Sequence, residues 1–164
     1  MINRPFSRIL VACALGLPGP VAAQELVFDI TPVEACIRAG GAETCAGKAA
    51  ALCMERTVGG QSTLGMSGCT DRELGHWDGW LNIVYQQLYA TLAARDANAP
   101  SYAPKEAEAL REMQRAWIAF RDAKCGYEAS QWGGGTGAGP ASVSCHLQET
   151  ARQMLYLQSS GLRG

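Results

Sequence analysis

The chain has 164 residues, of which 48% are hydrophobic and 18% are charged, and its formal net charge is −1. This length predicts one domain with a real hydrophobic core. The composition excludes a collagen, a coiled-coil rod and a wholly disordered chain. Because no run of lysines or arginines stands out, the sequence indicates no nucleic-acid partner and no anionic-membrane partner.

The first 23 residues have the pattern of an export signal. Two arginines precede an apolar stretch over residues 9–17, helix breakers follow, and the small residues Val21-Ala22-Ala23 end the segment. This order is typical of a cleaved signal peptide, whereas a membrane anchor would need about 20 apolar residues. We therefore expect a periplasmic or secreted mature chain that begins near Gln24 and has no membrane span.

A second interpretation of the leader concerns Cys13, because Leu10-Val11-Ala12-Cys13 resembles a lipoprotein signal. Only residues 9–12 would then form the apolar run before the modified cysteine, whereas this region usually has about 7–15 residues. Cleavage before Gln24 is therefore the prediction that we keep.

The mature chain would hold six cysteines, and an even number in an exported chain predicts disulfides. Pairing between sequence neighbours gives Cys36–Cys45, Cys53–Cys69 and Cys125–Cys145. The first two pairs could instead exchange partners, as Cys36–Cys53 with Cys45–Cys69. No C-x-x-C motif occurs and the two histidines stand apart, so we expect no bound metal. Without the leader arginines, 12 basic and 15 acidic residues leave a net charge of −3.

Residues 24–62 form a cysteine-rich N-terminal segment with two expected helices. Thr31-Pro32-x-Glu34 is typical of a helix start, with the threonine as N-cap and the glutamate completing a capping box. A second helix would span about residues 42–57. Ser62 or Thr63 would cap the helix that follows.

The strongest helical signal covers about residues 64–97, within an expected helical domain over residues 63–161. Its apolar side chains recur at steps of three and four, at Trp77, Leu81, Val84, Leu88 and Leu92. Gly75 and Gly79 lie inside this helix, and each weakens it by about 1 kcal/mol relative to alanine.

Two further helices are expected after this one. The fourth would start at Pro104 and carries a stripe at Leu110, Met113, Trp117, Phe120 and Lys124. Residues 132–140 are rich in glycine and predict an exposed, mobile loop. The fifth helix would cover about residues 141–159, with inward side chains at Val143, Leu147, Met154 and Leu157. No strand pattern is convincing, so we expect an all-α, disulfide-stapled bundle with a long antiparallel helix pair at its centre.

The sequence offers no convincing catalytic group. There is no G-x-S-x-G motif, the cysteines are expected in disulfides, and His76 is expected on a helix surface. The glycine-rich loop lacks the lysine of a phosphate-binding loop and does not follow a strand. We therefore expect that the protein is not an enzyme and uses no cofactor.

Two motifs are more specific than these features. The first begins with Met66-Ser67-Gly68-Cys69 and continues at helical spacing with Asp78, Leu81, Asn82, Tyr85 and Leu88. The second consists of Leu110, Gln114, Trp117, Arg121, Asp122 and Cys125. Residues three or four apart share one edge of a helix. We expect the two edges to pack together as a structural contact, with Arg121 meeting Asp78 or Asn82 and Trp117 covering the pair.

These motifs, in this order and at this separation, resemble the lysozyme-inhibitor LprI-like domain family over about residues 65–157. Cys145 and the tail Thr150-x-Arg152-x-x-Leu155 extend the resemblance. The family is exported, helical and disulfide-tied, and some of its members inhibit vertebrate-type lysozymes. The cysteine-rich segment 36–53 and the long loop 133–139 depart from the family pattern.

The resemblance implies a protein partner, with a lysozyme-like muramidase as the first candidate, which the chain would bind and block. A net negative chain would attract basic lysozymes. The alternative is an interaction or scaffold module of the cell envelope with no lysozyme partner. Because the core occupies the helix stripes, contacts would come from the loops 58–68 and 132–140, with Arg56 and Trp132 as contact residues. The alternative is that both loops are flexible linkers between the helices.

Overall fold

The computed structural model describes residues 25–161, so the expected leader, its cleavage site and Cys13 lie outside the described residues. The described elements are α1 (Thr31–Arg38), η1 (Glu43–Cys45), α2 (Lys48–Arg56), α3 (Thr63–Asn98), α4 (Glu106–Ser130) and α5 (Ala138–Gly161). This part of the chain contains no strand, and the prediction of an all-α bundle is confirmed. None of its helices is both long enough and apolar enough to cross a bilayer.

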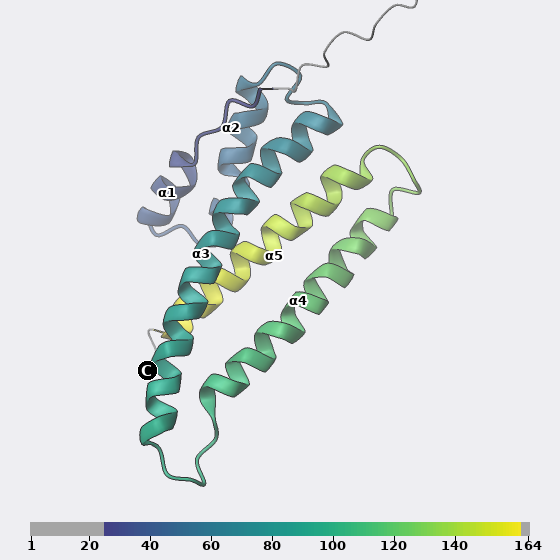
Figure 1. Ribbon diagram of the computed structural model, residues 1–164. Coiled ribbons are helices and arrows are strands. Elements are labelled where there is room, and N and C mark those ends of the chain that lie inside the picture. The colour runs from purple at the N-terminus through teal and green to yellow at the C-terminus, as the bar shows by residue number, and fades with distance from the viewer. Residues whose placement is uncertain (1–24, 162–164) are drawn as a thin grey trace, which may run out of the picture.

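Three long helices build the body of the bundle (Figure 1). α4 runs antiparallel to α3, and α5 turns back again, so that consecutive long helices are antiparallel. The most extensive packing nevertheless joins α3 to α5. α5 takes the central place because it buries side chains along most of its length, whereas α4 buries only Ala107, Leu110 and Cys125. α2 packs on α3, and α1 packs on α2.

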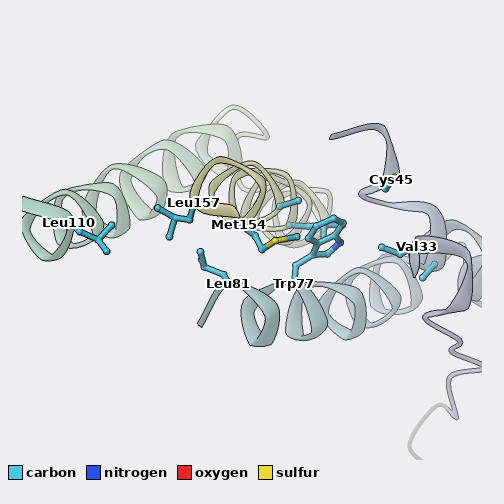
Figure 2. Packing of buried hydrophobic residues seen from close by; sticks show 10 residues of the cluster. Val33, Cys45, Trp77, Leu81, Leu110, Met154 and Leu157 are labelled. Atoms are coloured by element: carbon cyan, nitrogen blue, oxygen red, sulfur yellow. The ribbon is translucent and has the colours of Figure 1, made fainter. Parts of the chain in front are cut away.

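The core forms where α3 crosses α5. Figure 2 shows Trp77 and Leu81 of α3 turned toward Met154 and Leu157 of α5, and all four are buried. The remaining expected α3 positions, Val84, Leu88 and Leu92, pack against this cluster while partly buried. The predicted α3 stripe is therefore confirmed.

One apolar position of the expected α4 stripe is exposed. Phe120 is 58% exposed, whereas Leu110 of the same stripe is buried and Met113 and Trp117 pack against the core. α4 buries only Ala107, Leu110 and Cys125, and the ring of Phe120 lies outside this buried face.

The helix starts differ in detail from the expected caps. α1 begins at Thr31 itself, with Ile30 at the N-cap position and no side-chain cap. Just before it, the Asp29 carboxylate accepts hydrogen bonds from the Thr31 amide (2.9 Å) and hydroxyl (2.6 Å). These two bonds lower the pKa of Asp29, to which the nearby charge of Arg56 contributes. Ser62 caps α3 as expected, because its Oγ accepts from the Gly65 amide at 3.1 Å.

The expected second helix is divided in two. Gly47 has a φ of +97°, a left-handed conformation that glycine adopts without strain, and it separates η1 from α2. α5 in turn begins at Ala138, earlier than expected, with Pro140 in its first turn, where the missing amide proton costs no helical hydrogen bond.

All three disulfides form between sequence neighbours. Cys36–Cys45 joins α1 to η1, Cys53–Cys69 joins α2 to α3, and Cys125–Cys145 joins α4 to α5. The exchanged alternative for the first two pairs is thereby ruled out.

Candidate functional site

The second motif lies on the face of α4 that meets α5. Gln114 Oε1 accepts a hydrogen bond from Gln153 Nε2 at 2.8 Å, and Asp122 Oδ1 lies 3.5 Å from His146 Nε2. Together with Cys125–Cys145, these contacts follow one edge of α4 along its partner helix. These motif contacts therefore join α4 chiefly to α5, whereas α4 packs less extensively on α3.

The expected contact between Arg121 and the first motif is wrong. Arg121 Nη2 lies 2.8 Å from Asp122 Oδ1, and its guanidinium lies 5.0 Å from the centre of the Trp117 ring. Asp78 instead accepts a hydrogen bond from Asn82 on its own helix, at 3.2 Å. Each charge finds its partner within its own helix, because α4 packs closely on α5 and less on α3.

The first motif divides into a packed half and an exposed half. Leu81 is buried in the core, and Tyr85 is half-buried beside Tyr89, with ring centres 6.1 Å apart. Asp78 and Asn82 are exposed on the outer edge of α3. Leu81 and Tyr85 therefore act as packing residues.

Sequence analysis missed a buried carboxylate that organises the N-terminal half. Glu73 is 0% exposed, and its two oxygens accept hydrogen bonds from the amides of Gly47 and Ala50, both at 2.7 Å. The Trp77 indole donates a third bond, at 3.0 Å. Glu73 thus fixes the first turn of α2 to α3. The signal was an acid in the buried row Cys69, Glu73, Trp77 and Leu81, at steps of four.

A second charged group ties α5 to two neighbours. Glu149 Oε1 accepts from Lys124 Nζ at 2.7 Å and from Arg152 Nη1 at 2.5 Å, and Arg152 Nε donates to Glu43 Oε2 at 2.9 Å. The hydrogen bond with Glu43, together with the charge of Glu149, raises the pKa of Arg152. These charges are paired with one another and connect α4, α5 and η1.

Both histidines make contacts within the fold. His146 Nδ1 lies 2.8 Å from the Ser142 carbonyl oxygen, and the His76 ring is stacked on Phe28 with centres 5.6 Å apart. Neither contact pairs a base with a nucleophile. Over residues 25–161, no three His, Cys, Asp or Glu side chains gather in a way that could hold a metal ion.

The two loops that sequence analysis selected as contact regions lie at the same end of the bundle (Figure 1). A Cβ atom added at Gly139 in α5 would lie 3.6 Å from Ser67 Oγ in α3, so the first turns of these helices touch. Trp132 projects from the α4–α5 loop with 55% of its surface exposed. Arg56 is exposed at the end of α2, near Asp29.

The glycine-rich loop is exposed, as expected, and it contains local contacts of its own. Gly133 and Gly134 adopt positive φ angles, and the Gly135 amide donates to the Trp132 carbonyl oxygen at 2.8 Å. The Trp132 ring lies against Gly137, where an added Cβ would come within 2.2 Å of a ring carbon. Only glycine at position 137 allows this contact, which fixes the ring over the loop.

A groove of about 740 Å³ lies at the opposite end, between α3, α4 and α5. Its lining includes Leu88, Leu92, Leu110 and Met113, and the ion pair of Arg95 with Glu106 stands beside it. The groove is mostly apolar, and none of the expected contact residues lines it.

The fold and its three disulfides define a small, disulfide-stapled helical protein built on one core. The family described as Lysozyme inhibitor LprI matches residues 53–157, and the chain belongs to this family. The match begins at Cys53 and therefore includes the Cys53–Cys69 disulfide and the α2–α3 loop.

Two bacterial proteins show the breadth of the similarity. An uncharacterised 17.7 kDa protein in the puhA 5′ region of Rhodobacter capsulatus is 26% identical over 156 residues, covering 90% of this chain and 91% of that one. An uncharacterised protein of Rhizobium meliloti (strain 1021) is 33% identical over 98 residues, covering 56% of this chain and 68% of that one. No solved structure matches the chain significantly.

Proposed function

We propose that this protein is an exported inhibitor that binds a lysozyme-like muramidase and blocks it. Membership of the family described as Lysozyme inhibitor LprI is the observation that carries the proposal. Three disulfides suit an oxidising compartment such as the periplasm, and the expected leader of residues 1–23 would direct the chain there.

The physical basis of inhibition is occupation of the enzyme's cleft. A muramidase cleaves its glycan between two carboxyl groups on either side of the scissile bond. A protein that fills this cleft excludes the glycan, and it needs a stable surface of matching shape but no reactive group. The mature net charge of −3 favours encounter with a basic enzyme.

The test is the clearing of a cell-wall suspension by a vertebrate-type lysozyme, with and without the purified mature protein. We expect the clearing rate to fall with increasing protein. The same protein with its disulfides reduced and alkylated serves as the control, and we expect it to leave the rate unchanged. Full clearing in the presence of excess oxidised, folded protein would contradict the proposal and favour an envelope interaction module.

A further inference from the structure

Two segments at the end of the bundle that holds both contact loops carry no formal charge. Residues 57–70 and 129–145 include no Asp, Glu, Lys or Arg, although 18% of the whole chain is charged. The first segment spans the α2–α3 loop and the first turns of α3, and the second spans the α4–α5 loop and the first turns of α5. We name these two segments together the uncharged tip.

Large apolar side chains are exposed on the uncharged tip. Leu64 is 70% exposed in the first turn of α3, Val58 is 93% exposed in the α2–α3 loop, and Trp132 stands on the α4–α5 loop. Single exposed apolar residues are common on protein surfaces. Here they lie on two segments at one end of the bundle, and neither segment contains a charged residue, although the Glu128 carboxylate accepts a hydrogen bond from Gln131 at 3.3 Å at the edge of the second one. A low content of charged residues is typical of the centre of a binding site.

Both loops of the uncharged tip are closed at their base. Cys53–Cys69 bridges the ends of α2 and α3 across the first loop, and Cys125–Cys145 bridges α4 and α5 across the second. The first loop is also tightly packed, because a Cβ atom added at Gly65 would lie 2.4 Å from the Gly59 carbonyl oxygen. A surface held in this way loses little conformational entropy when it binds.

The hydrogen-bonding groups of the second loop indicate what the tip fits. The amides of Gly134, Thr136 and Gly137 have no hydrogen-bond partner among the described residues, so they are left to donate. Trp132 adds a broad aromatic ring beside them, a residue type that dominates binding energy at interfaces. Neutral donors beside an aromatic ring suit a cleft lined by carboxylates and shaped for sugar rings, since an acidic tip would be repelled there.

We propose that the uncharged tip is the part of this protein that enters the muramidase cleft, with Trp132 and Leu64 as its main contacts. This inference rests on the proposed function. Arg56, exposed at the rim of the tip, would meet acidic groups at the edge of the cleft. The catalytic carboxylates would face the free amides of the α4–α5 loop.

The test compares the mature protein with Trp132→Ala and Leu64→Asp by calorimetric titration of a vertebrate-type lysozyme. Leu64→Asp places a charge on the tip and leaves the Trp132 ring on Gly137 in place. We expect each substitution to weaken binding by at least about 30-fold, the size of a hot-spot effect. Tyr102→Ala is the matched control, because Tyr102 is an exposed aromatic residue in the α3–α4 loop. We expect this variant to bind the lysozyme as tightly as the parent does. A soluble oligomer of N-acetylglucosamine that fills the cleft should compete with the protein.

The outcomes separate the two proposals. If the parent protein inhibits and both folded tip variants bind as tightly as Tyr102→Ala, the inference on the tip is wrong and the proposed function stands. If the parent neither binds nor inhibits, both fail. Binding of the parent to phosphatidylcholine vesicles, or self-association in sedimentation, that Leu64→Asp abolishes would also overturn the inference, because another occupant would then use the tip.

Discussion

Glu73→Ala tests the buried hydrogen bonds of the N-terminal half. The substitution removes the acceptor of three buried donors, the amides of Gly47 and Ala50 and the indole of Trp77. Because these bonds fix the first turn of α2 to α3, the effect should reach the whole N-terminal half and not only one side chain.

The expected magnitude follows from the three donors. A buried donor that loses its acceptor costs about 1–3 kcal/mol. The hydrogen-bond partners of the Glu73 carboxylate include no cation, so removing this buried group also offsets part of the cost. We therefore expect the free energy of unfolding to fall by about 3 kcal/mol or more, a large share of the roughly 5–15 kcal/mol of a typical domain. Glu73→Gln should lower the free energy of unfolding by less than Glu73→Ala, because one acceptor oxygen remains. Some loss is still expected, because the new side-chain NH2 group would face a donor.

Urea unfolding of the oxidised protein at neutral pH, followed by circular dichroism, measures this change. Glu55→Ala is the control, because Glu55 is an exposed glutamate on α2, and its substitution should shift the unfolding free energy by no more than about 0.5 kcal/mol. If the free energy of unfolding of Glu73→Ala lies within about 1 kcal/mol of that of this control, the role that we assign to the carboxylate is refuted.

Three further predictions concern stability. Replacing Cys125 and Cys145 together with serine opens a loop of 20 residues, and it should lower the unfolding free energy by about 3 kcal/mol in urea titrations; an unchanged free energy would contradict this. Gly79→Ala should raise this free energy by about 0.5–1 kcal/mol, because an added Cβ meets nothing within 4 Å on α3, and no gain would contradict this. The Asp96 carboxylate accepts hydrogen bonds from the Ala107 and Glu106 amides, which lower the pKa of Asp96 from its ordinary value. Its stabilising effect is therefore present at neutral pH and lost as the pH falls through the lowered pKa. Asp96→Asn should lower Tm at pH 7, and the difference should vanish in acid; a difference that persists there would contradict this.

Features set by local sequence were predictable. The three disulfides join neighbouring cysteines, and the apolar spacing of α3 fixes both its extent and its buried face. Ser62 caps α3 through a bond to Gly65, which is a contact within four residues. In each case the partners lie close together in the chain, so the pattern carries the information.

Contacts that depend on which helices pack against each other were not predictable from the sequence. Arg121 has a carboxylate at the next residue and an aromatic ring one turn back, and these satisfy it without α3. The amides that Glu73 binds lie 26 and 23 residues away, in a turn that only tertiary packing brings close. Trp132 was expected as a contact residue, but that its loop lies at the same end of the bundle as the α2–α3 loop depends on how α3 and α5 cross.

The central claim is that the protein blocks a muramidase by occupying its cleft. The most direct measurement is a titration of a vertebrate-type lysozyme with the mature oxidised protein, while hydrolysis of a soluble oligomer of N-acetylglucosamine is recorded. The account predicts that activity falls as protein is added, that more substrate relieves the inhibition, and that the endpoint corresponds to one inhibitor for each enzyme. Unchanged hydrolysis in a large molar excess of folded protein would contradict it.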